Sequence, residues 1–251
     1  MDVWIYTIVS VLIISFISLI GVFTLSLRVD WVKKITLFLV SFAVGGLFGD
    51  AFIHLLPETF RDANSGLMSS LYVIIGFLIF FVLEKFLRWR HCHVPSHQQT
   101  HPVVTMNLVS DGVHNLIDGV LVGASFSVSI PIGITTSLAI VLHEIPQEIG
   151  DFGVLVHCGL TAKRALLFNF LSGLVAVIGA VASLVIGPHI QGYSEALLPM
   201  TAGGFLYIAG SDLIPELQHD VKVSTSFWQF VGIILGVSIM ALMTLIEMPG
   251  Q

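Results

Sequence analysis

Charged residues are scarce in this chain. Only 10% of its 251 residues are charged, whereas 55% are hydrophobic and the mean hydropathy is +0.96. Soluble domains carry about 25% charged residues, so this composition excludes an ordinary soluble domain. Ten basic against sixteen acidic residues, with no basic patch, also exclude a nucleic-acid-binding surface. The composition predicts an all-α, polytopic membrane protein.

Cysteine is nearly absent too. The two cysteines, Cys92 and Cys158, exclude the disulfide framework of a small secreted protein. The chain does not begin with the charged segment, short apolar run and cleavage site that together make a secretory signal. Residues 3–27 instead form one long uncharged run, which predicts a spanning helix and not a removable signal.

Eight segments are long and apolar enough to cross a bilayer, which takes about 20 residues. They are residues 3–27, 35–56, 67–87, 103–126, 131–156, 164–187, 194–216 and 226–246. We therefore expect a single transmembrane domain over 1–251 with eight helices. Its longest connection, 88–102, is a histidine-bearing loop.

The basic residues lie almost entirely on one side of this predicted topology. Nine of the ten follow odd-numbered spans, and only Arg61 lies on the other side. Because basic connections stay in the cytoplasm, the bias predicts that both termini lie outside it. Both cysteines then fall on the cytoplasmic side, which favours free thiols. We expect an integral protein of the plasma (inner) membrane.

Polar side chains are concentrated in four spans, around "GDAFIHLLPE", "SDGVHNLIDG", "HEIPQEIGD" and "AGSDLIPE". Because polar groups in lipid are costly, they usually line a cavity or pathway. Helical spacing stacks His114 on Asp118 and His143 on Gln147. Pro146 is expected to kink its helix and to expose the carbonyl of Leu142 to a polar space.

The polar side chains of these four spans offer nitrogen and oxygen ligands and no cysteine sulfur. Such a set suits borderline to hard divalent ions such as zinc, iron, manganese or cadmium. It does not suit a closed structural zinc site, which favours thiolates. Exchangeable coordination is what a transporter requires.

The pair "HNLIDG" and "HEIPQEIGDF" in consecutive spans resembles the ZIP family of divalent-metal transporters, in the branch with an HExPHE signature. "GDAFIHLLPE" and "LLFNFLSGL" extend the resemblance over the whole chain. The resemblance implies that the protein is a transporter and not an enzyme. It implies that the protein moves a divalent metal ion into the cytosol, with zinc as the first candidate and iron, manganese or cadmium as alternatives. The resemblance implies that the protein contacts membrane lipid and binds neither a permanent cofactor nor nucleic acid. It also allows a homodimer.

The resemblance also implies a binuclear metal centre between the fourth and fifth spans. Carried over by motif, one site uses His114, Asp118, His143 and Gln147. The other uses Asn115, Asp118, Glu144, Gln147 and Asn169. Glutamine replaces the signature histidine at 147, which weakens transition-metal coordination and shifts the balance toward harder ions or lower affinity.

Further polar residues are candidates for the transport pathway. Those expected on the entrance side are Asp50, His54 and Glu58, and those expected toward the cytoplasm are Ser110, Asp111, Glu148, Asp151 and Asp212, with Glu216 beside them. The loop histidines that could capture released metal are His91, His93, His97 and His101.

Other functions fit parts of this pattern. A proton relay uses the same side chains, and a buried hydrogen-bonded network would only lock helices together. A membrane-embedded metallohydrolase predicts one zinc with an open position and a general base, and a metal sensor predicts binding without flux. "HEIPQ" lacks the second histidine of the zinc-protease HExxH.

Overall fold

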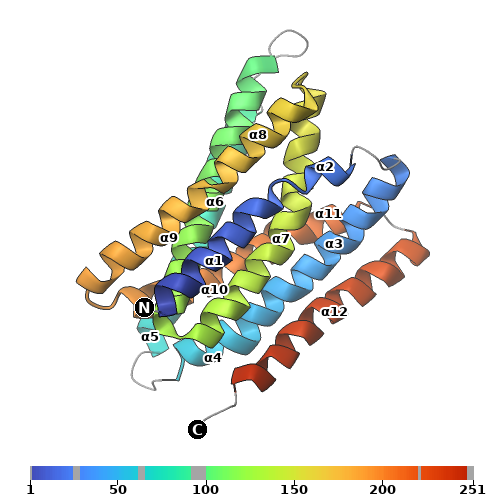
Figure 1. Cartoon of the computed structure of the whole chain (residues 1–251). Helices are drawn as coiled ribbons and strands as arrows, with labels where there is room; N and C mark the ends of the chain where they lie inside the picture. Colours follow the sequence, from blue (N-terminus) through green and yellow to red (C-terminus); the bar gives the residue numbers. More distant parts are fainter. Residues whose placement is uncertain (1, 25–28, 62–65, 92–99, 220–221, 248–251) are drawn as a thin grey trace.

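The computed structural model describes residues 2–24, 29–61, 66–91, 100–219 and 222–247, and within these ranges it contains helices and no strand. The helices are α1 (Asp2–Ile17), α2 (Gly21–Thr24), α3 (Val29–Gly49), η1 (Asp50–Leu55), α4 (Leu56–Thr59), α5 (Gly66–His91), α6 (Thr100–Val128), α7 (Ile130–His157), α8 (Ala162–Gly173), α9 (Val175–Ile186), η2 (Gly187–His189), α10 (Tyr193–Tyr207), η3 (Ile208–Leu213), α11 (Ile214–Gln218) and α12 (Val223–Glu247). Together they form the eight predicted spans, packed as one bundle (Figure 1).

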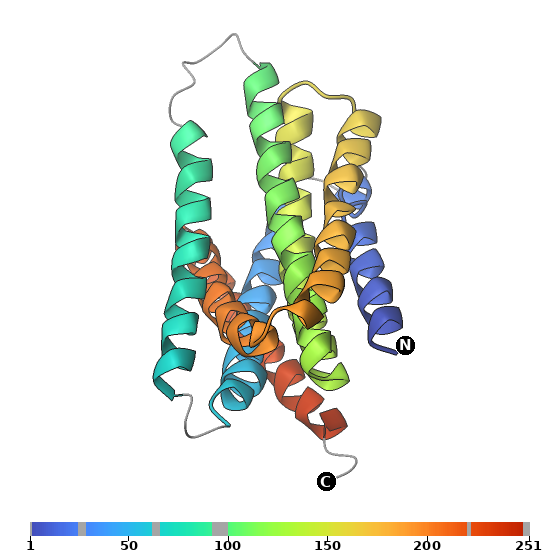
Figure 2. The ribbon, with the colours of Figure 1, turned by 90° about the vertical axis from the view of Figure 1, so that its left-hand side faces the viewer.

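The spans alternate in direction through the bundle. The end of α5, the start of α6 and the α7–α8 connection lie at one end of the molecule (Figure 2). The α6–α7 connection, the start of α1 and the end of α12 lie toward the opposite end (Figure 2). This arrangement confirms the prediction of an all-α bundle of eight spans.

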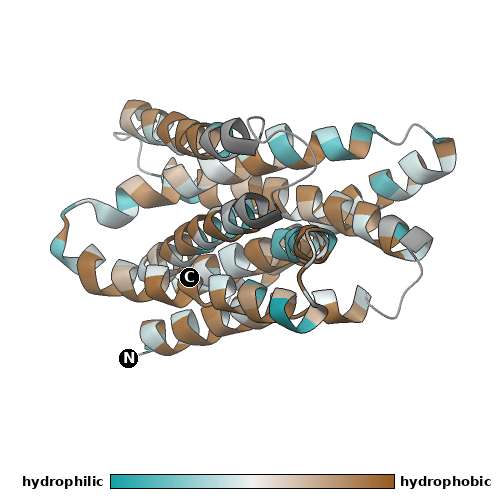
Figure 3. Cartoon of the chain, turned by 90° about the horizontal axis from the view of Figure 1, so that it is seen from above, coloured by the Kyte–Doolittle hydropathy of each residue, from teal (hydrophilic) through white to brown (hydrophobic). Residues whose placement is uncertain are grey.

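The two spans α6 and α7 differ from the others in polarity. Length and composition alone mark six helices of the described chain as able to cross a membrane, and α6 and α7 are not among them. Yet they have 29 and 28 residues, enough for about 40 Å at 1.5 Å per residue. Hydrophilic residues interrupt an otherwise hydrophobic ribbon (Figure 3). Their low hydropathy therefore comes from the polar motifs that they carry.

A single residue joins α6 to α7. Ser129 is extended, with φ −160° and ψ 157°, and its hydroxyl caps α7 by accepting a hydrogen bond from the Ile132 N–H at 3.3 Å. So short a connection forces the two helices to run antiparallel as neighbours. The motif around His114 is thereby placed against the motif around His143.

Two spans contain a π-helical segment that the sequence analysis did not anticipate. Both η1 and η3 are π-helices, and each ends two residues before a proline, Pro57 and Pro215 respectively. Proline has no N–H and clashes with the preceding turn, so the hydrogen-bond ladder widens there. In contrast, α7 continues as one helix through Pro146.

Glycine permits very close contact within three pairs of helices. A Cβ on Gly119 of α6 would lie 1.9 Å from the Ala176 carbonyl oxygen of α9, and one on Gly179 would lie 2.1 Å from the Leu116 oxygen. Reciprocal glycines join α3 to α12 and α5 to α10 in the same way: Gly45 with Gly236, and Gly76 with Gly203. Small residues are the usual means of close helix packing in membranes.

We expect Gly119→Ala to destabilise the protein by about 2 kcal/mol, because the added methyl group overlaps a backbone oxygen that cannot rotate away. Gly153→Ala in α7 is the matched control, since no atom lies within 4 Å of its added Cβ. Thermal unfolding of the detergent-purified variants measures the difference. Equal melting temperatures would contradict the packing described here.

Candidate metal centre

Four side chains from α6 and α7 converge on one point. His114 and Asp118 come from α6, and His143 and Glu144 come from α7. One ligand atom from each lies within 4.8 Å of the others. His114 is 19% exposed, whereas the other three side chains are at most 1% exposed. The cluster is therefore enclosed by the bundle and reached from the side of His114.

The distances between these ligand atoms match a single small cation. His143 Nε2 lies 3.3 Å from Asp118 Oδ2, and His114 Nε2 lies 3.5 Å from Glu144 Oε1. The two Nε2 atoms are 3.3 Å apart, and the other two distances between an imidazole and a carboxylate, His114 Nε2 to Asp118 Oδ2 and His143 Nε2 to Glu144 Oε1, are 3.7 Å. Tetrahedral zinc with bonds of about 2.0–2.1 Å holds its ligand atoms about 3.3–3.4 Å apart. The arrangement fits four-coordinate binding without a large rearrangement.

Neighbouring groups orient the two imidazoles. Nδ1 of His143 lies 3.1 Å from the Ala139 carbonyl oxygen, to which it can only donate, so in the neutral imidazole the nitrogen left to bind a metal is Nε2, which faces the cluster. Phe80 of α5 packs edge-on against His114, with ring centres 6.3 Å apart. Phe205 of α10 packs in the same way against His143, at 6.2 Å. An imidazole can bind a metal ion only when one of its ring nitrogens points at the ion, as the Nε2 atoms of these two rings point at the cluster.

The carboxylates of the cluster lack ordinary partners. Both oxygens of Asp118 and both of Glu144 are buried, and none accepts a well-aligned hydrogen bond from the described residues. A buried charge without compensation is strongly unfavourable. A divalent cation among the four groups would supply that compensation.

Asn115 and Asn169 lie beside this cluster in different surroundings. The Asn115 amide nitrogen donates to the Asp111 side chain at 2.8 Å, and the Asn169 amide nitrogen donates to the Glu148 side chain at 2.8 Å. The carbonyl oxygen of each asparagine is buried without a donor among the described residues. Each thus has an oxygen free to coordinate a cation.

Glu148 lies at a contact between helices. Its carboxylate also accepts a hydrogen bond of 2.6 Å from Ser18, which follows α1. With Asn169 of α8, these groups tie α7 to two neighbours. Glu148 is thus buried and hydrogen-bonded, and its predicted place on the exit side stays a prediction.

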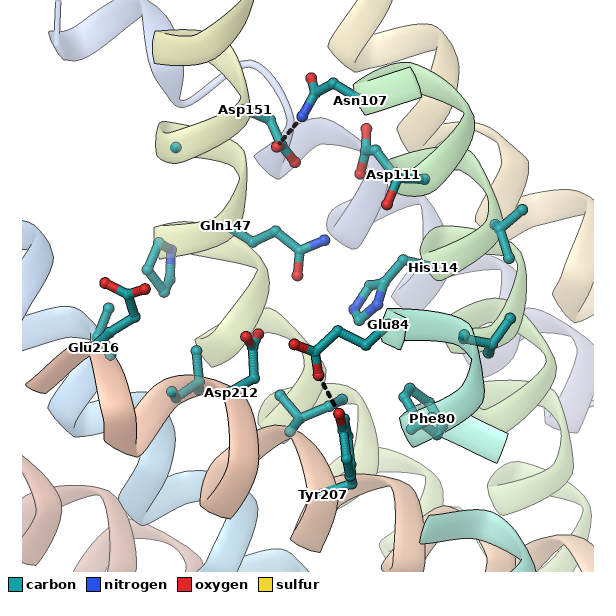
Figure 4. A pocket seen from close by; sticks show the side chains of 18 of the residues that line it. Phe80, Glu84, Asn107, Asp111, His114, Gln147, Asp151, Tyr207, Asp212 and Glu216 are labelled. Carbon is teal, nitrogen blue, oxygen red and sulfur yellow. Dashed lines mark hydrogen bonds between the residues drawn. The ribbon is translucent and has the colours of Figure 1, made fainter. Parts of the chain in front are cut away.

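A cavity of about 440 Å³ adjoins the cluster on the His114 side (Figure 4). His114 and Gln147 face it from α6 and α7. Four residues predicted as cytoplasmic pathway groups line it: Ser110, Asp111, Asp151 and Asp212. Glu216 lines it as well and is exposed. The cavity therefore extends from the cluster toward the end of the bundle where α7 ends and α6 begins.

Sequence reasoning missed several polar residues of this cavity, among them Asn107 and Glu84. Asn107 donates to Asp151 at 2.6 Å, and Glu84 of α5 accepts a hydrogen bond from the Tyr207 hydroxyl. Asn107 precedes Asp111 by four residues and so shares its helix face, which was a usable signal. Glu84 stands next to Lys85 near the end of an apolar span and resembles an ordinary interfacial residue.

The residues predicted on the entrance side do not line this cavity. His54 Nε2 lies 2.9 Å from the Met240 carbonyl oxygen of α12, and Asp50 is buried in η1. Glu58 pairs with Arg61 at 3.5 Å and lines a separate hollow of about 940 Å³. The loop residues His93 and His97 lie outside the described residues, as do the side chains of His91 and His101.

Comparison with known proteins agrees with this architecture. A family profile described as ZIP zinc transporter matches residues 1–103 and 90–244. The zinc transporter zipt-7.1 of Caenorhabditis briggsae is 31% identical, over 83% of this chain and 71% of that protein. The zinc transporter YKE4 of Saccharomyces cerevisiae is 32% identical, over 94% and 79% respectively. The metal cation symporter ZIP14 of Mus musculus is 28% identical, over 97% and 68%. The chain therefore belongs to the ZIP family of zinc transporters, which are integral membrane proteins and not enzymes.

Proposed function

We propose that this protein moves zinc into the cytosol through a site formed by His114, Asp118, His143 and Glu144. The observation that carries the proposal is the convergence of these four ligand atoms within 4.8 Å, with both carboxylates buried and without a well-aligned hydrogen bond from the described residues. Two imidazoles and two carboxylates give zinc a complete tetrahedral shell of exchangeable ligands. The names of the matched relatives support zinc as the first cargo to test.

A second ion is proposed beside the first. The buried, donor-free carbonyl oxygens of Asn115 and Asn169 support this, together with the second oxygens of Asp118 and Glu144. A carboxylate can bridge two ions through its two oxygens, so Asp118 would belong to both positions. Gln147, which faces the cavity, would complete the centre on the exit side.

Inward direction is supported by the position of charges and of the cavity. Among the described side chains, Lys85, Lys163 and Arg164 lie at the end of the bundle where α5 ends and α8 begins. Basic residues of this kind stay on the cytoplasmic side of the plasma membrane that we propose for this protein. The cavity runs from the cluster toward the same end, so the conformation described is open to the cytosol. Alternating access would then require the opposite end to open.

Removing a ligand should abolish transport. We expect His114→Ala and Glu144→Gln each to lower zinc uptake into proteoliposomes at least about tenfold, because each removes one of four metal ligands. His157→Ala is the matched control, since His157 is exposed at the end of the same helix. Uptake equal to the parent in both ligand variants would refute the site. If the parent protein binds zinc but does not take it up into proteoliposomes, the protein is a metal sensor and not a transporter.

Residue 147 should tune the choice of metal. We expect Gln147→His to raise the ratio of zinc to manganese uptake several-fold, because imidazole favours zinc over manganese more than an amide oxygen does. Gln147→Glu should lower that ratio, since carboxylate suits the harder ion. Competition uptake with both metals present measures the ratio. If the two variants do not move it in opposite directions, Gln147 does not contact the cargo.

The native cysteines can test the orientation. We expect a membrane-impermeant maleimide to label Cys92 and Cys158 only after the cells are permeabilised, because both would lie on the cytoplasmic side. Gln191→Cys, in a Cys92→Ser, Cys158→Ser background, should be labelled in intact cells. Gln191 is exposed between η2 and α10 at the opposite end. The reverse labelling pattern would invert the proposed direction of transport.

A further inference from the structure

A groove of about 480 Å³ lies between the first turns of α12 and the early part of α3. It contains none of the four ligands of the metal centre, and the one lining residue that it shares with the cavity beside that centre is Leu37. The lining residues on which the argument depends are Trp31, Lys34, Phe38, Ser224, Thr225 and Trp228.

The groove lies at the level where two spans enter the apolar layer. The hydrophobic span that contains α3 begins at Lys34, and that of α12 begins at Val223. Tryptophan and lysine are typical of the boundary between headgroups and acyl chains. The side chains of Trp31 in α3 and Trp228 in α12 are 59% and 60% exposed. The groove is therefore placed at a membrane interface, where a lipid can reach it.

The polar part of the groove is suited to an anion. Lys34 is exposed, and its Nζ lies 6.0 Å from the centre of the Trp31 ring. Ser224 and Thr225 lie in the first turn of α12, and within the described chain neither hydroxyl makes a hydrogen bond. The start of a helix carries partial positive charge and free N–H groups. None of the described side chains that line the groove is acidic.

The rest of the groove is apolar except for Gln229, whose amide nitrogen donates to the Leu217 carbonyl oxygen at 3.1 Å. Phe38 and its neighbours on α3 continue the lining away from Lys34 into the hydrophobic span. A ligand that fills the groove must therefore carry an anionic group at one end and a hydrocarbon at the other. A free phosphate ion would satisfy only the polar end.

We propose that this groove binds an anionic glycerophospholipid. Its phosphate lies between Lys34 and the hydroxyls of Ser224 and Thr225, and one acyl chain lies along Phe38. Basic sites between membrane helices bind acidic headgroups through this combination of charge and hydrocarbon contact. The lipid would bridge α3 and α12, which the reciprocal contacts of Gly45 and Gly236 already hold together. The proposal is independent of metal transport, and the leaflet is the cytoplasmic one if the proposed orientation holds.

The test titrates delipidated, detergent-purified protein with phosphatidylglycerol, with phosphatidylcholine of the same acyl chains, and with inorganic phosphate. Native mass spectrometry counts bound lipid, and thermal unfolding reports stabilisation. We expect phosphatidylglycerol to bind at least about tenfold more tightly than phosphatidylcholine, and inorganic phosphate to give no stabilisation. Equal affinity for the two lipids would overturn the proposal, as would full stabilisation by phosphate alone.

Two variants locate the site. Lys34→Gln and Ser224→Asp should each remove the preference for phosphatidylglycerol and leave phosphatidylcholine binding unchanged. Both positions are exposed, and aspartate in a first helical turn does not disfavour the helix, so both variants should fold. Lys163→Gln is the matched control, because Lys163 is an exposed lysine of α8, outside the groove. An unchanged preference in Lys34→Gln and Ser224→Asp, or an equal loss in Lys163→Gln, would overturn the assignment.

Discussion

The rest of this structure depends on two carboxylates that are buried in a hydrophobic bundle without hydrogen-bond donors. Asp118 and Glu144 are at most 1% exposed, and among the described residues the basic side chains within 4 Å of them are the imidazoles of His114 and His143. Two negative charges at this depth are unfavourable unless a cation accompanies them. In the proposed function, a divalent ion would neutralise both carboxylates and would be coordinated by the two imidazoles. That role would explain why so apolar a chain retains these costly residues.

Packing keeps the ligands in place while leaving one side accessible. The one-residue connection at Ser129 sets α6 against α7, and the glycine contacts of Gly119 and Gly179 fix α6 to α9. The bonds of Glu148 to Ser18 and Asn169 attach α7 to the α1–α2 turn and to α8. Other helices, α3, α5 and α10 with η3, supply the opposite wall of the cavity. The helices that carry the candidate ligands thus form a closely joined group that faces a second group across the cavity.

Much of the fold and part of the centre could be predicted from the sequence. Hydrophobic length gave the spans to within a few residues, for example 131–156 against Ile130–His157. The spacing of His114 and Asp118 placed them on one helix face, as the structure has them. The different surroundings of Glu144 and Glu148 could not be predicted, although the two are four residues apart on one helix. Which neighbour each carboxylate meets depends on how α1 and α8 pack, and a single helix does not encode that contact. The π-helices before Pro57 and Pro215 and the Glu84–Tyr207 bond likewise arise from tertiary packing.

The central claim is that two imidazoles and two carboxylates hold the cargo together. X-ray absorption at the zinc edge, on purified protein loaded with one equivalent of zinc, tests it most directly. The account predicts a four-coordinate ion with two imidazole nitrogens and two oxygens at about 2.0–2.1 Å, and no sulfur. A spectrum with sulfur at about 2.3 Å, or an all-oxygen shell without imidazole scattering, would contradict it.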